Sequence, residues 1–572
     1  MPAVVVVLGS WSYRWVQEDA FINFRIIGNI LAGHGPVFNV GERVEAYTDP
    51  LWVFVLAILH TVLPMVSFEW MSVLLGIAMT ALGVVLAGRA VQRLAADREQ
   101  GVVLPLGLLV FGSVAAVWEF STGGLELGMV FGWIGLSVWL LVRTEGRRVS
   151  AVWCAFVIGL GILIRPELVL MSLVFLVGLS IVVAAPGWKG PGSVVRRYLA
   201  PAAAAAALPV VYELFRASYF ALVVSNTALA KSAGSAWWSQ GAYYLWNFVS
   251  PYLLYLPFVM AALLVVPRVA SWWHRGDRMG TVVLATPVVA GLADTLYVTR
   301  LGGDYMHGRL LLPAFFALCL CVWATTAQLR SIAVIPVVVI VVWSVACLGW
   351  LRFTTGSPYT VVHGIANERS FWVAALGNPH PITASDWHQS ASPGTAYRLA
   401  ASAARKSGHK SMLVVTDPTE LFPTDGVRPA RSTLPFWFVV NSTDIGFNGY
   451  VSGPDVYIFD TFSLANPIGS HTSLAVRGRP GHEKDIGPEW MIARFGVPGG
   501  ALPVGMSQGS VDAARRALSC TPLSSYLHAI TAPLTPSLAL SNVLHSLDYT
   551  KLQFNPNPVL AERQVCSTAS HH

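Results

Sequence analysis

Charged side chains are scarce in this chain of 572 residues. Only 12% of its residues are Asp, Glu, Lys or Arg, whereas 54% are hydrophobic. Soluble globular domains carry about twice that share of charge, and disordered chains carry few hydrophobic residues. The composition therefore excludes both classes and predicts an integral membrane protein.

Cysteine is also scarce, and the six cysteines form no Cys/His pattern typical of a zinc site. Cys520 and Cys566 lie in the polar C-terminal part, where they could form a disulfide if that part faces an oxidising compartment. The sequence leaves this pairing open, because it does not give their distance in space. The other four pack as small hydrophobic groups inside apolar runs, at Cys154, Cys319, Cys321 and Cys347.

Long apolar runs fill the first 351 residues. A helix that crosses a bilayer needs about 20 mostly apolar residues. The sequence predicts eleven such helices, at 2–16, 69–90, 102–118, 124–143, 150–164, 167–185, 198–215, 252–270, 280–298, 310–327 and 331–351. The first run lacks a basic flank and a cleavage site, so we do not interpret it as a signal peptide. We predict a polytopic membrane domain over 1–351 and a second domain over 352–572.

Basic residues mark one side of this predicted bundle. The positive-inside rule assigns basic connections to the cytoplasm. They occur at 89–98, 143–148, 189–197, 268–278 and 330. The apolar stretch 51–66 agrees with this pattern only as a re-entrant or surface helix. We expect a plasma-membrane protein with a cytoplasmic N-terminus and an extracytoplasmic C-terminal domain. The net charge of +7 then requires no nucleic-acid partner.

The C-terminal part contains no run long enough to span a membrane. Residues that favour strands occur at 412–415, 436–440, 456–459 and 490–495. Amphipathic segments predict helices at 395–405 and 510–518. We expect a mixed α/β or β-rich domain.

An acidic pair, Glu18 and Asp19, follows the first predicted span. A carboxylate at the edge of an apolar phase can act as a base, because partial desolvation raises its pKa. On a helix Asp19 shares a face with Asn23, whereas Glu18 lies nearer Arg25, so the two acids have different roles. The alternative is a solvated helix start, where acidic residues interact favourably with the helix dipole.

More polar residues lie in the predicted outer loops. An Arg at the end of a span is costly unless protein or a polar cavity surrounds it. Ordinary turns, a snorkelling Arg and a polar hairpin between spans are the structural alternatives. The candidates for binding the substrate are His34, Asp49, Glu126, Arg165, Asn226, Lys231, Asp304, His307 and Arg309.

These residues meet three chemical requirements. Arg and Lys bind phosphate, a carboxylate can activate a hydroxyl, and a helix bundle supplies an apolar groove for a lipid tail. An enzyme that takes a sugar from a lipid phosphate needs all three. Asp19, together with Glu18, is the catalytic candidate.

Several stretches resemble the GT-C class of membrane glycosyltransferases, which use polyprenyl-phosphate sugars. They are 18–19, 47–52, 122–126, 165–167, 226–231 and 302–309. Within that class, 226–248, 302–313, 479–493 and 541–554 resemble the mycobacterial terminal β-(1→2)-arabinofuranosyltransferase family, and the similarity spans most of the chain. That family has Asp-Asp where this chain has Glu18-Asp19, which favours Asp19 over Glu18.

The resemblance implies transfer of arabinofuranose from decaprenylphosphoryl arabinose to the ends of arabinan in arabinogalactan and lipoarabinomannan. It also implies an outer domain of the carbohydrate-binding type. Donor and product are both β-configured in that family, so the implied reaction retains configuration. In-line attack with Asp19 as the base would invert it. Asp19 as a nucleophile, or as a group that stabilises an oxocarbenium-like state, is equally open.

Other possibilities stay open at this stage. Another lipid-linked sugar could be the donor. A transporter or a non-enzymatic envelope regulator is a third class, but a transporter should carry charges mid-span and inverted repeats. A divalent cation, Mg²⁺ or Mn²⁺, could be held by Asp19, Asp49, Asp304 and the donor phosphate. The oligomeric state cannot be deduced from the sequence, and a monomer is the simplest expectation.

Overall fold

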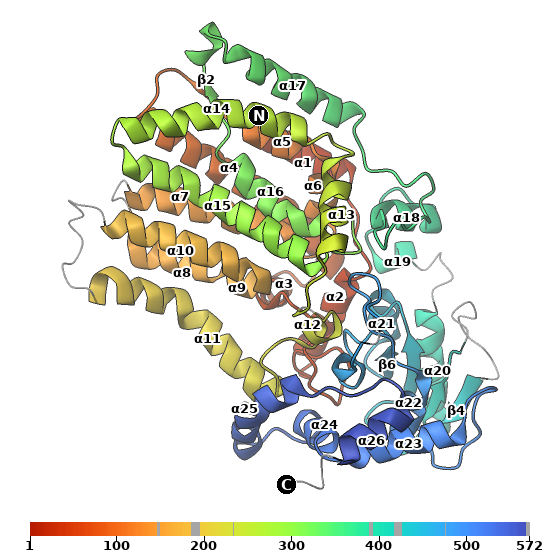
Figure 1. Cartoon of the computed structure of the whole chain (residues 1–572). Coiled ribbons are helices and arrows are strands. Elements are labelled where there is room, and N and C mark those ends of the chain that lie inside the picture. The colour runs from red at the N-terminus through yellow and green to blue at the C-terminus, as the bar shows by residue number, and fades with distance from the viewer. Residues whose placement is uncertain are drawn as a thin grey trace.

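The computed structural model describes residues 1–145, 149–184, 195–232, 234–387, 393–416, 426–474 and 476–567. Helices dominate it. In Figure 1 long helices run side by side through the N-terminal part, and the blue C-terminal part lies across one end of the structure. The predicted α-helical architecture is confirmed in this coarse form.

The helices before residue 352 are α1 (Pro2–Ser12), α2 (Ala20–Leu31), α3 (Pro50–Val62), α4 (Phe68–Ala96), α5 (Leu106–Ser113), α6 (Ala115–Thr122), α7 (Leu127–Glu145), α8 (Ala151–Gly159), α9 (Gly161–Ile164), α10 (Val169–Ala184), α11 (Ala200–Phe220), α12 (Asn226–Ala230), α13 (Trp238–Val249), α14 (Tyr255–His274), α15 (Arg278–Leu301), α16 (Leu312–Cys319) and α17 (Val334–Gly349). Two short strands, β1 (Val103–Leu104) and β2 (Ala324–Thr325), pair antiparallel.

Within the described residues, six helical segments are long and apolar enough to cross a membrane. They are Phe68–Ala96, Leu127–Glu145, Pro166–Ala184, Arg197–Phe220, Tyr255–His274 and Arg278–Leu301. Each corresponds to one of the eleven predicted spans. The other five predicted spans form shorter apolar helices, so the total of eleven stays a prediction. Helix α3 has 13 residues, which is too short to cross a bilayer by itself.

Two of the predicted spans are not continuous helices. Segment 102–118 begins with β1 and is then broken between α5 and α6, because Val114 is extended with ψ of 125°. Segment 310–327 ends its helix at Cys319 and continues into β2. A Cβ on Gly107 of α5 would lie 1.8 Å from the carbonyl oxygen of Cys319. The two interrupted segments therefore pack backbone to backbone, which hydropathy along the chain cannot predict.

Glycines bring α4 and α7 into close contact. A Cβ on Gly128 would lie 2.4 Å from the carbonyl oxygen of Gly76, and a Cβ on Gly135 would lie 2.3 Å from that of Gly83. Small residues at such spacing are typical of helix pairs in membranes, where close backbone packing replaces the hydrophobic effect. The outward faces of α11, α14, α15 and α17 expose large apolar side chains, as a lipid-facing surface would.

The C-terminal part contains a four-stranded sheet of β3 (Ser411–Leu413), β4 (Val427–Pro429), β5 (Phe438–Ser442) and β6 (Val456–Asp460). The strand order is β4-β3-β5-β6; β3, β5 and β6 are parallel, and β4 is antiparallel to β3. The helices are α18 (Glu368–Leu376), α19 (Ala384–Trp387), α20 (Gly394–Ser407), α21 (Gly446–Ser452), α22 (Pro488–Phe495), α23 (Gln508–Ser519), α24 (Leu523–Thr531), α25 (Pro536–Lys551) and α26 (Pro558–Ser567).

Most sequence predictions for this part are confirmed. Three of the four expected strands form as β3, β5 and β6, and both expected amphipathic helices form as α20 and α23. The strand expected at 490–495 is wrong, because this segment is α22. Pro488 occupies the first turn of α22, where its fixed φ favours a helix, and the buried Trp490 and Met491 fit a helix face as well as a strand. Cys520 and Cys566 form a disulfide that links α23 to α26.

The first outer loop and the C-terminal sheet share one hydrophobic core. Phe21 and Phe24 of α2 pack in the same buried cluster as Phe438 of β5 and Ile458 of β6. Arg25 donates from Nε to the carbonyl oxygen of Phe38 at 2.6 Å and from Nη2 to that of Val456 at 2.7 Å. The predicted boundary at residue 351 is thus bridged by buried contacts, and this positions α2 against the C-terminal part.

Candidate active site

Asp19 lies at the centre of a charged cluster. Residues 18–19 form a turn before α2, which begins at Ala20. Tyr305 Oη donates to Asp19 Oδ2 at 3.1 Å across 286 positions of sequence, and Arg309 Nη1 lies 3.6 Å from the same oxygen. The Asp19 side chain keeps 19% of its exposure, whereas that of Arg309 keeps 8%. Asp19 is therefore the accessible acid beside a buried cation.

The loop after α15 supplies the partners of Asp19. Gly303 and Gly308 have positive φ, and a Cβ on Gly303 would lie 2.2 Å from the Tyr244 ring. Only glycine allows this loop to turn so tightly against α13. Arg309 Nε forms an ion pair with Asp304 Oδ2 at 3.0 Å. Arg309 thus lies between two carboxylates, one of which stays accessible.

A second ionic group adjoins the first. Arg165 Nη1 bonds Glu126 Oε1 at 2.7 Å, and Arg165 Nε donates to Glu167 Oε1 at 2.6 Å. The charges of Arg165 and Arg309 repel each other, so the two guanidinium groups are close in space. This ion pairing explains why the predicted Arg165 can be buried at the end of a helix, and it excludes the snorkelling alternative.

Asp49 belongs to this second group and not to the Asp19 cluster. Asn23 Nδ2 donates to Asp49 Oδ2 at 2.7 Å. Burial first, and then the Glu126 carboxylate, raise the pKa of Asp49 well above its usual value. Asn23 was expected to share a face with Asp19; in the structure its amide binds Asp49 instead.

Glu18 has a different environment from Asp19, as predicted. Its Oε1 accepts from the backbone N–H of Phe447 at 2.8 Å, at the start of α21. Arg25 bonds the carbonyl oxygens of Phe38 and Val456, and no hydrogen bond or ion pair joins it to Glu18 among the described residues. Burial first, and then the negative charges of Asp444 and Asp19, raise the pKa of Glu18 well above its usual value.

The charge of Asp19 acts on two more carboxyl groups, those of Glu368 and Asp444. Burial, followed by the charge of Asp19, raises the pKa of Glu368 to about 8. The pKa of Asp444, which is exposed at the cavity wall, is also raised, first by desolvation from the neighbouring protein, while Arg479 opposes the shift. A site that gathers carboxyl groups with raised pKa values around one accessible acid is typical of proton or glycosyl transfer.

A cavity of about 990 Å³ adjoins this cluster, at the carboxyl ends of β5 and β6. Glu18 and Asp444 line it together with main-chain and polar groups around Asn441 and Ser442. Aromatic side chains form much of its wall, namely Phe371, Trp372, Trp387, Tyr397, Phe447 and Phe462. Aromatic faces combined with a few polar groups suit the C–H faces and hydroxyls of a sugar.

Lys231 lies on another side of the cluster. Its charge acts on His482 and on Glu483, and Asp304 also acts on His482. Arg479 lies over the Tyr305 ring with 5.8 Å between its guanidinium carbon and the ring centroid. The Asp19 cluster therefore has two further cations nearby, Lys231 and Arg479.

Three of the predicted residues have other environments. His34 is exposed after α2, and no hydrogen bond or ion pair joins its side chain to the Asp19 cluster in the described ranges. His307 stacks on Phe353 at 3.8 Å, and burial lowers its pKa to about 3, so it supplies no positive charge for a phosphate. Asn226 is fully buried and bonds the carbonyl oxygens of Ser463 and Leu464, which makes it a tether to the C-terminal part.

The expected metal ligands do not fit a divalent cation. Arg309 occupies the space between Asp19 and Asp304, and Asp49 is held by Asn23 in the neighbouring group. Among the described residues, no three His, Cys, Asp or Glu side chains are arranged around one point as metal ligands. We therefore derive no step through a metal.

Several residues of the site were not predicted. Tyr305 and His482 lie in stretches that resemble the arabinofuranosyltransferase family. In these stretches the sequence prediction includes the charged or titratable residues Asp304, His307 and Arg309, but neither Tyr305 nor His482. Glu368 and Asp444 carried no local signal, because each is a lone acid in a polar region. Their proximity to Asp19 depends on how α18 and α21 pack.

Comparison with known proteins relates the whole chain to one enzyme family. A terminal β-(1→2)-arabinofuranosyltransferase from Mycobacterium tuberculosis is 32% identical, with 97% of this chain and 95% of that protein aligned. The chain belongs to the terminal β-(1→2)-arabinofuranosyltransferase family. A protein of the same name from Corynebacterium glutamicum is 29% identical, with 96% of this chain and 84% of that protein aligned.

The family model agrees. The AftB family C-terminal domain matches residues 422–563, which include β4, β5, β6 and α21 to α26. No solved structure matches the chain. Membership of this arabinofuranosyltransferase family makes the chain a glycosyltransferase and disfavours the transporter and regulator alternatives.

Proposed function

We propose that this membrane protein transfers arabinofuranose from a polyprenyl-phosphate donor, decaprenylphosphoryl arabinose, to the ends of cell-wall arabinan and forms terminal β-(1→2) linkages. The main support is the position of Asp19, which lies against Arg309 and Tyr305 beside an aromatic cavity. The acceptor chains are those of arabinogalactan and lipoarabinomannan.

Arg309 is the proposed ligand of the donor phosphate. Its Nε pairs with Asp304 at 3.0 Å, whereas its Nη1 lies 3.6 Å from Asp19, too far for a hydrogen bond. Lys231 and Arg479 would add positive charge on the open side. A guanidinium binds phosphate through two N–H groups at once, which would fix the sugar relative to Asp19.

Asp19 is the proposed catalytic carboxylate. Tyr305 Oη donates to one carboxylate oxygen and leaves the other available to the sugar. A carboxylate in this position can attack the anomeric carbon or stabilise positive charge that develops on the ring. Both routes are compatible with retention of configuration. Glu18, which accepts a hydrogen bond from the backbone of α21, positions the cavity wall.

The cavity at the ends of β5 and β6 is the proposed acceptor site. Trp372, Trp387 and Phe447 would stack on sugar rings, and Asp444 would accept hydrogen bonds from hydroxyl groups. On this view residues 352–572 form a carbohydrate-binding domain and 1–351 form the GT-C catalytic domain.

The proposed topology places this site outside the cytoplasm. Basic residues gather at the opposite ends of α4, α7 and α15, as the positive-inside rule requires of a cytoplasmic face. The disulfide between Cys520 and Cys566 suits an oxidising compartment. Eleven apolar segments would then cross the plasma membrane, and the N-terminus would be cytoplasmic.

Substitution of Asp19 tests the reaction. Asp19→Asn should reduce transfer from synthetic decaprenylphosphoryl arabinose by about a thousandfold or more, because the group that meets the sugar loses its charge. Asp97→Asn, an exposed acid at the other end of the bundle, is the matched control and should keep full activity. Mannose and glucose donors should give no product with either. Full activity of Asp19→Asn in a folded protein would refute the proposal.

Cysteine labelling tests the topology. An impermeant maleimide should label Ser235→Cys in intact cells, because Ser235 is exposed near the Asp19 end of the bundle. The exposed Gln100→Cys, at the other end, should react only after the membrane is opened. The reverse pattern would place the site in the cytoplasm and contradict the proposed donor and acceptor.

A further inference from the structure

A second hollow, of about 780 Å³, lies at the end of the bundle opposite to Asp19. Helix α7 begins directly after Glu126, near the Asp19 cluster, and ends at Glu145. Helix α15 runs between the same two ends, with Gly302 next to it near the Asp19 cluster and Asp277 next to it at the opposite end. The hollow is formed by α14, the start of α17 and the segment that follows α4. Nothing in the proposed reaction uses it.

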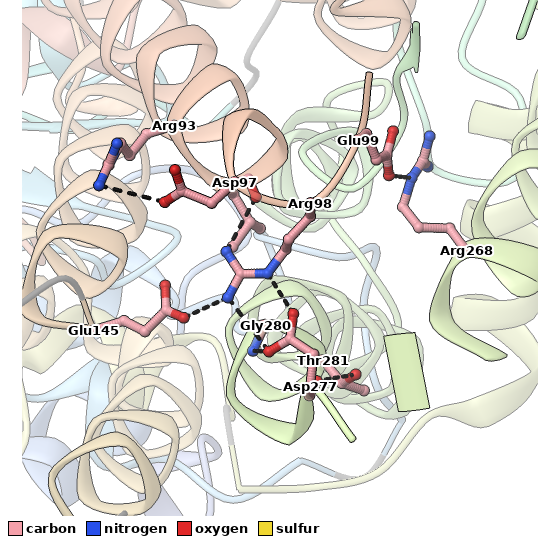
Figure 2. A network of polar contacts seen from close by, with 10 residues as sticks. Arg93, Asp97, Arg98, Glu99, Glu145, Arg268, Asp277, Gly280 and Thr281 are labelled. Atoms are coloured by element: carbon pink, nitrogen blue, oxygen red, sulfur yellow. Dashed lines mark hydrogen bonds and ion pairs between the residues drawn. The ribbon is translucent and has the colours of Figure 1, made fainter. Parts of the chain in front are cut away.

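The inner wall of the hollow includes Arg98, Glu99 and Arg268, whose ion pairs are drawn in Figure 2. Arg98 is neutralised by Asp277 at 2.5 Å and by Glu145. Arg268 Nε bonds Glu99 Oε1 at 2.6 Å, and its Nη2 donates to the carbonyl oxygen of Trp323 at 2.8 Å. These ion pairs join the segments that form the inner wall.

Two positively charged side chains in this wall keep donors that could bind a ligand, although Arg268 is paired with Glu99 through Nε. Arg268 is 5% exposed, and its Nη1 has no hydrogen-bond partner among the described residues. A buried charged donor without a partner is destabilising, so such a donor is expected to bind a ligand. Arg275 is exposed at the rim, and its side chain forms no hydrogen bond or ion pair within the described ranges, although its charge acts on Asp277. An anion can meet both.

The remaining wall is apolar and open. Leu263 of α14 is 57% exposed, and Ile332 and Ile335 near the start of α17 are 83% and 55% exposed. The same faces continue into exposed apolar residues such as Val259 and Val342. Since these faces would contact lipid in a membrane, the hollow opens toward the bilayer.

We propose that this hollow binds an anionic glycerophospholipid of the adjacent leaflet. Its phosphodiester would contact Arg268 Nη1 and Arg275, and one acyl chain would lie along Leu263 and Ile335. A free phosphate would satisfy the charges but would leave the apolar wall uncovered. The proposal is independent of the proposed reaction, because it shares no residue with the Asp19 cluster.

Lipid binding to the delipidated full-length protein, measured by native mass spectrometry, tests this proposal. Phosphatidylglycerol should bind, phosphatidylcholine should bind more weakly, and inorganic phosphate should not compete. Arg275→Gln should weaken phosphatidylglycerol binding about fivefold, the effect of one Arg near an anionic headgroup. Ile335→Gln should also weaken it, because an amide replaces part of the acyl-chain wall. Arg278→Gln, an exposed cation outside the hollow, should leave binding unchanged.

Four outcomes would overturn the proposal. Equal losses in Arg275→Gln and Arg278→Gln would indicate unspecific attraction by the basic face. Binding of inorganic phosphate in competition with the lipid would indicate a phosphate site. Preference for decaprenyl phosphate over phosphatidylglycerol would indicate a site for the spent carrier. Unchanged binding in Arg275→Gln and Ile335→Gln would exclude the hollow altogether.

Discussion

The two ends of the helix bundle both carry buried charges, but they are arranged differently. At the inner end, Arg98 and Arg268 are matched to acids by ion pairs of 2.5–2.6 Å. At the outer end, Arg309 is 3.6 Å from Asp19, and Glu368 holds a proton because its pKa is raised. Matched pairs join helices. Charged groups without a close partner, placed around an accessible acid, can form new interactions when a substrate binds. This difference distinguishes a reactive site from a structural one.

Among the substitutions that test this comparison of the two ends, the largest expected effect concerns Arg309. Arg309→Ala should raise the KM for the lipid donor by about 10- to 100-fold and change the KM for the arabinan acceptor little, because a charge-assisted phosphate contact is lost. Arg300→Ala is the control, since Arg300 lies at the end of α15 and its side chain donates to the carbonyl oxygen of Gly234 in an exposed contact. Equal changes in both KM values would mean that Arg309 supports the fold and not the donor.

Arg98 should show the opposite behaviour. Arg98→Ala should lower the free energy of unfolding by about 2–3 kcal/mol, because it leaves Glu145 and Asp277 partly buried without their partner. Thermal unfolding in detergent measures this loss, and the KM for the donor should not change in the folded variant. Arg93→Ala, which removes an exposed pair with Asp97, should cost about 0–0.5 kcal/mol. A donor effect in Arg98→Ala would remove the contrast between the two ends.

The smallest effect is a pH dependence at Glu368. The folded protein keeps a proton on Glu368 up to a pKa of about 8, whereas the unfolded chain loses it near 4.5. This group's contribution to stability is complete below pH 4.5 and decreases as the pH rises toward 8. Glu368→Gln should therefore flatten the fall in Tm between pH 5 and 9 by a few degrees. An identical pH profile in wild type and variant would show that Glu368 ionises normally.

Local sequence predicted a good deal of the fold. Run length and hydropathy identified the six long helices, and short runs of residues that favour strands identified β3, β5 and β6. Prediction failed where a neighbour decides the conformation. Val114 breaks a long apolar run, and 490–495 is a helix although its residues favour a strand. Both outcomes depend on packing partners that lie far away in sequence.

For the candidate site, sequence identified the charged members but not their pairing. Asp19, Asp304, Arg309, Arg165 and Glu126 were all chosen as unusual charges beside apolar runs, and the structure joins them in two adjacent groups. Tyr305, Glu368 and Asp444 were missed.

Sequence by itself determined that the protein belongs in a membrane and which ends of the helices are basic. It also identified the charged residues beside apolar runs, whose free-energy cost in a membrane indicates a specific role. These properties follow from composition and spacing, because each residue's transfer free energy is largely its own. Only the tertiary structure decided that Asp19 meets Arg309 and not Asp49, and that the charge of Asp19 acts on Glu368 and Asp444. Such proximity depends on how helices and loops far apart in sequence pack, and burial then determines which carboxyl groups keep their protons.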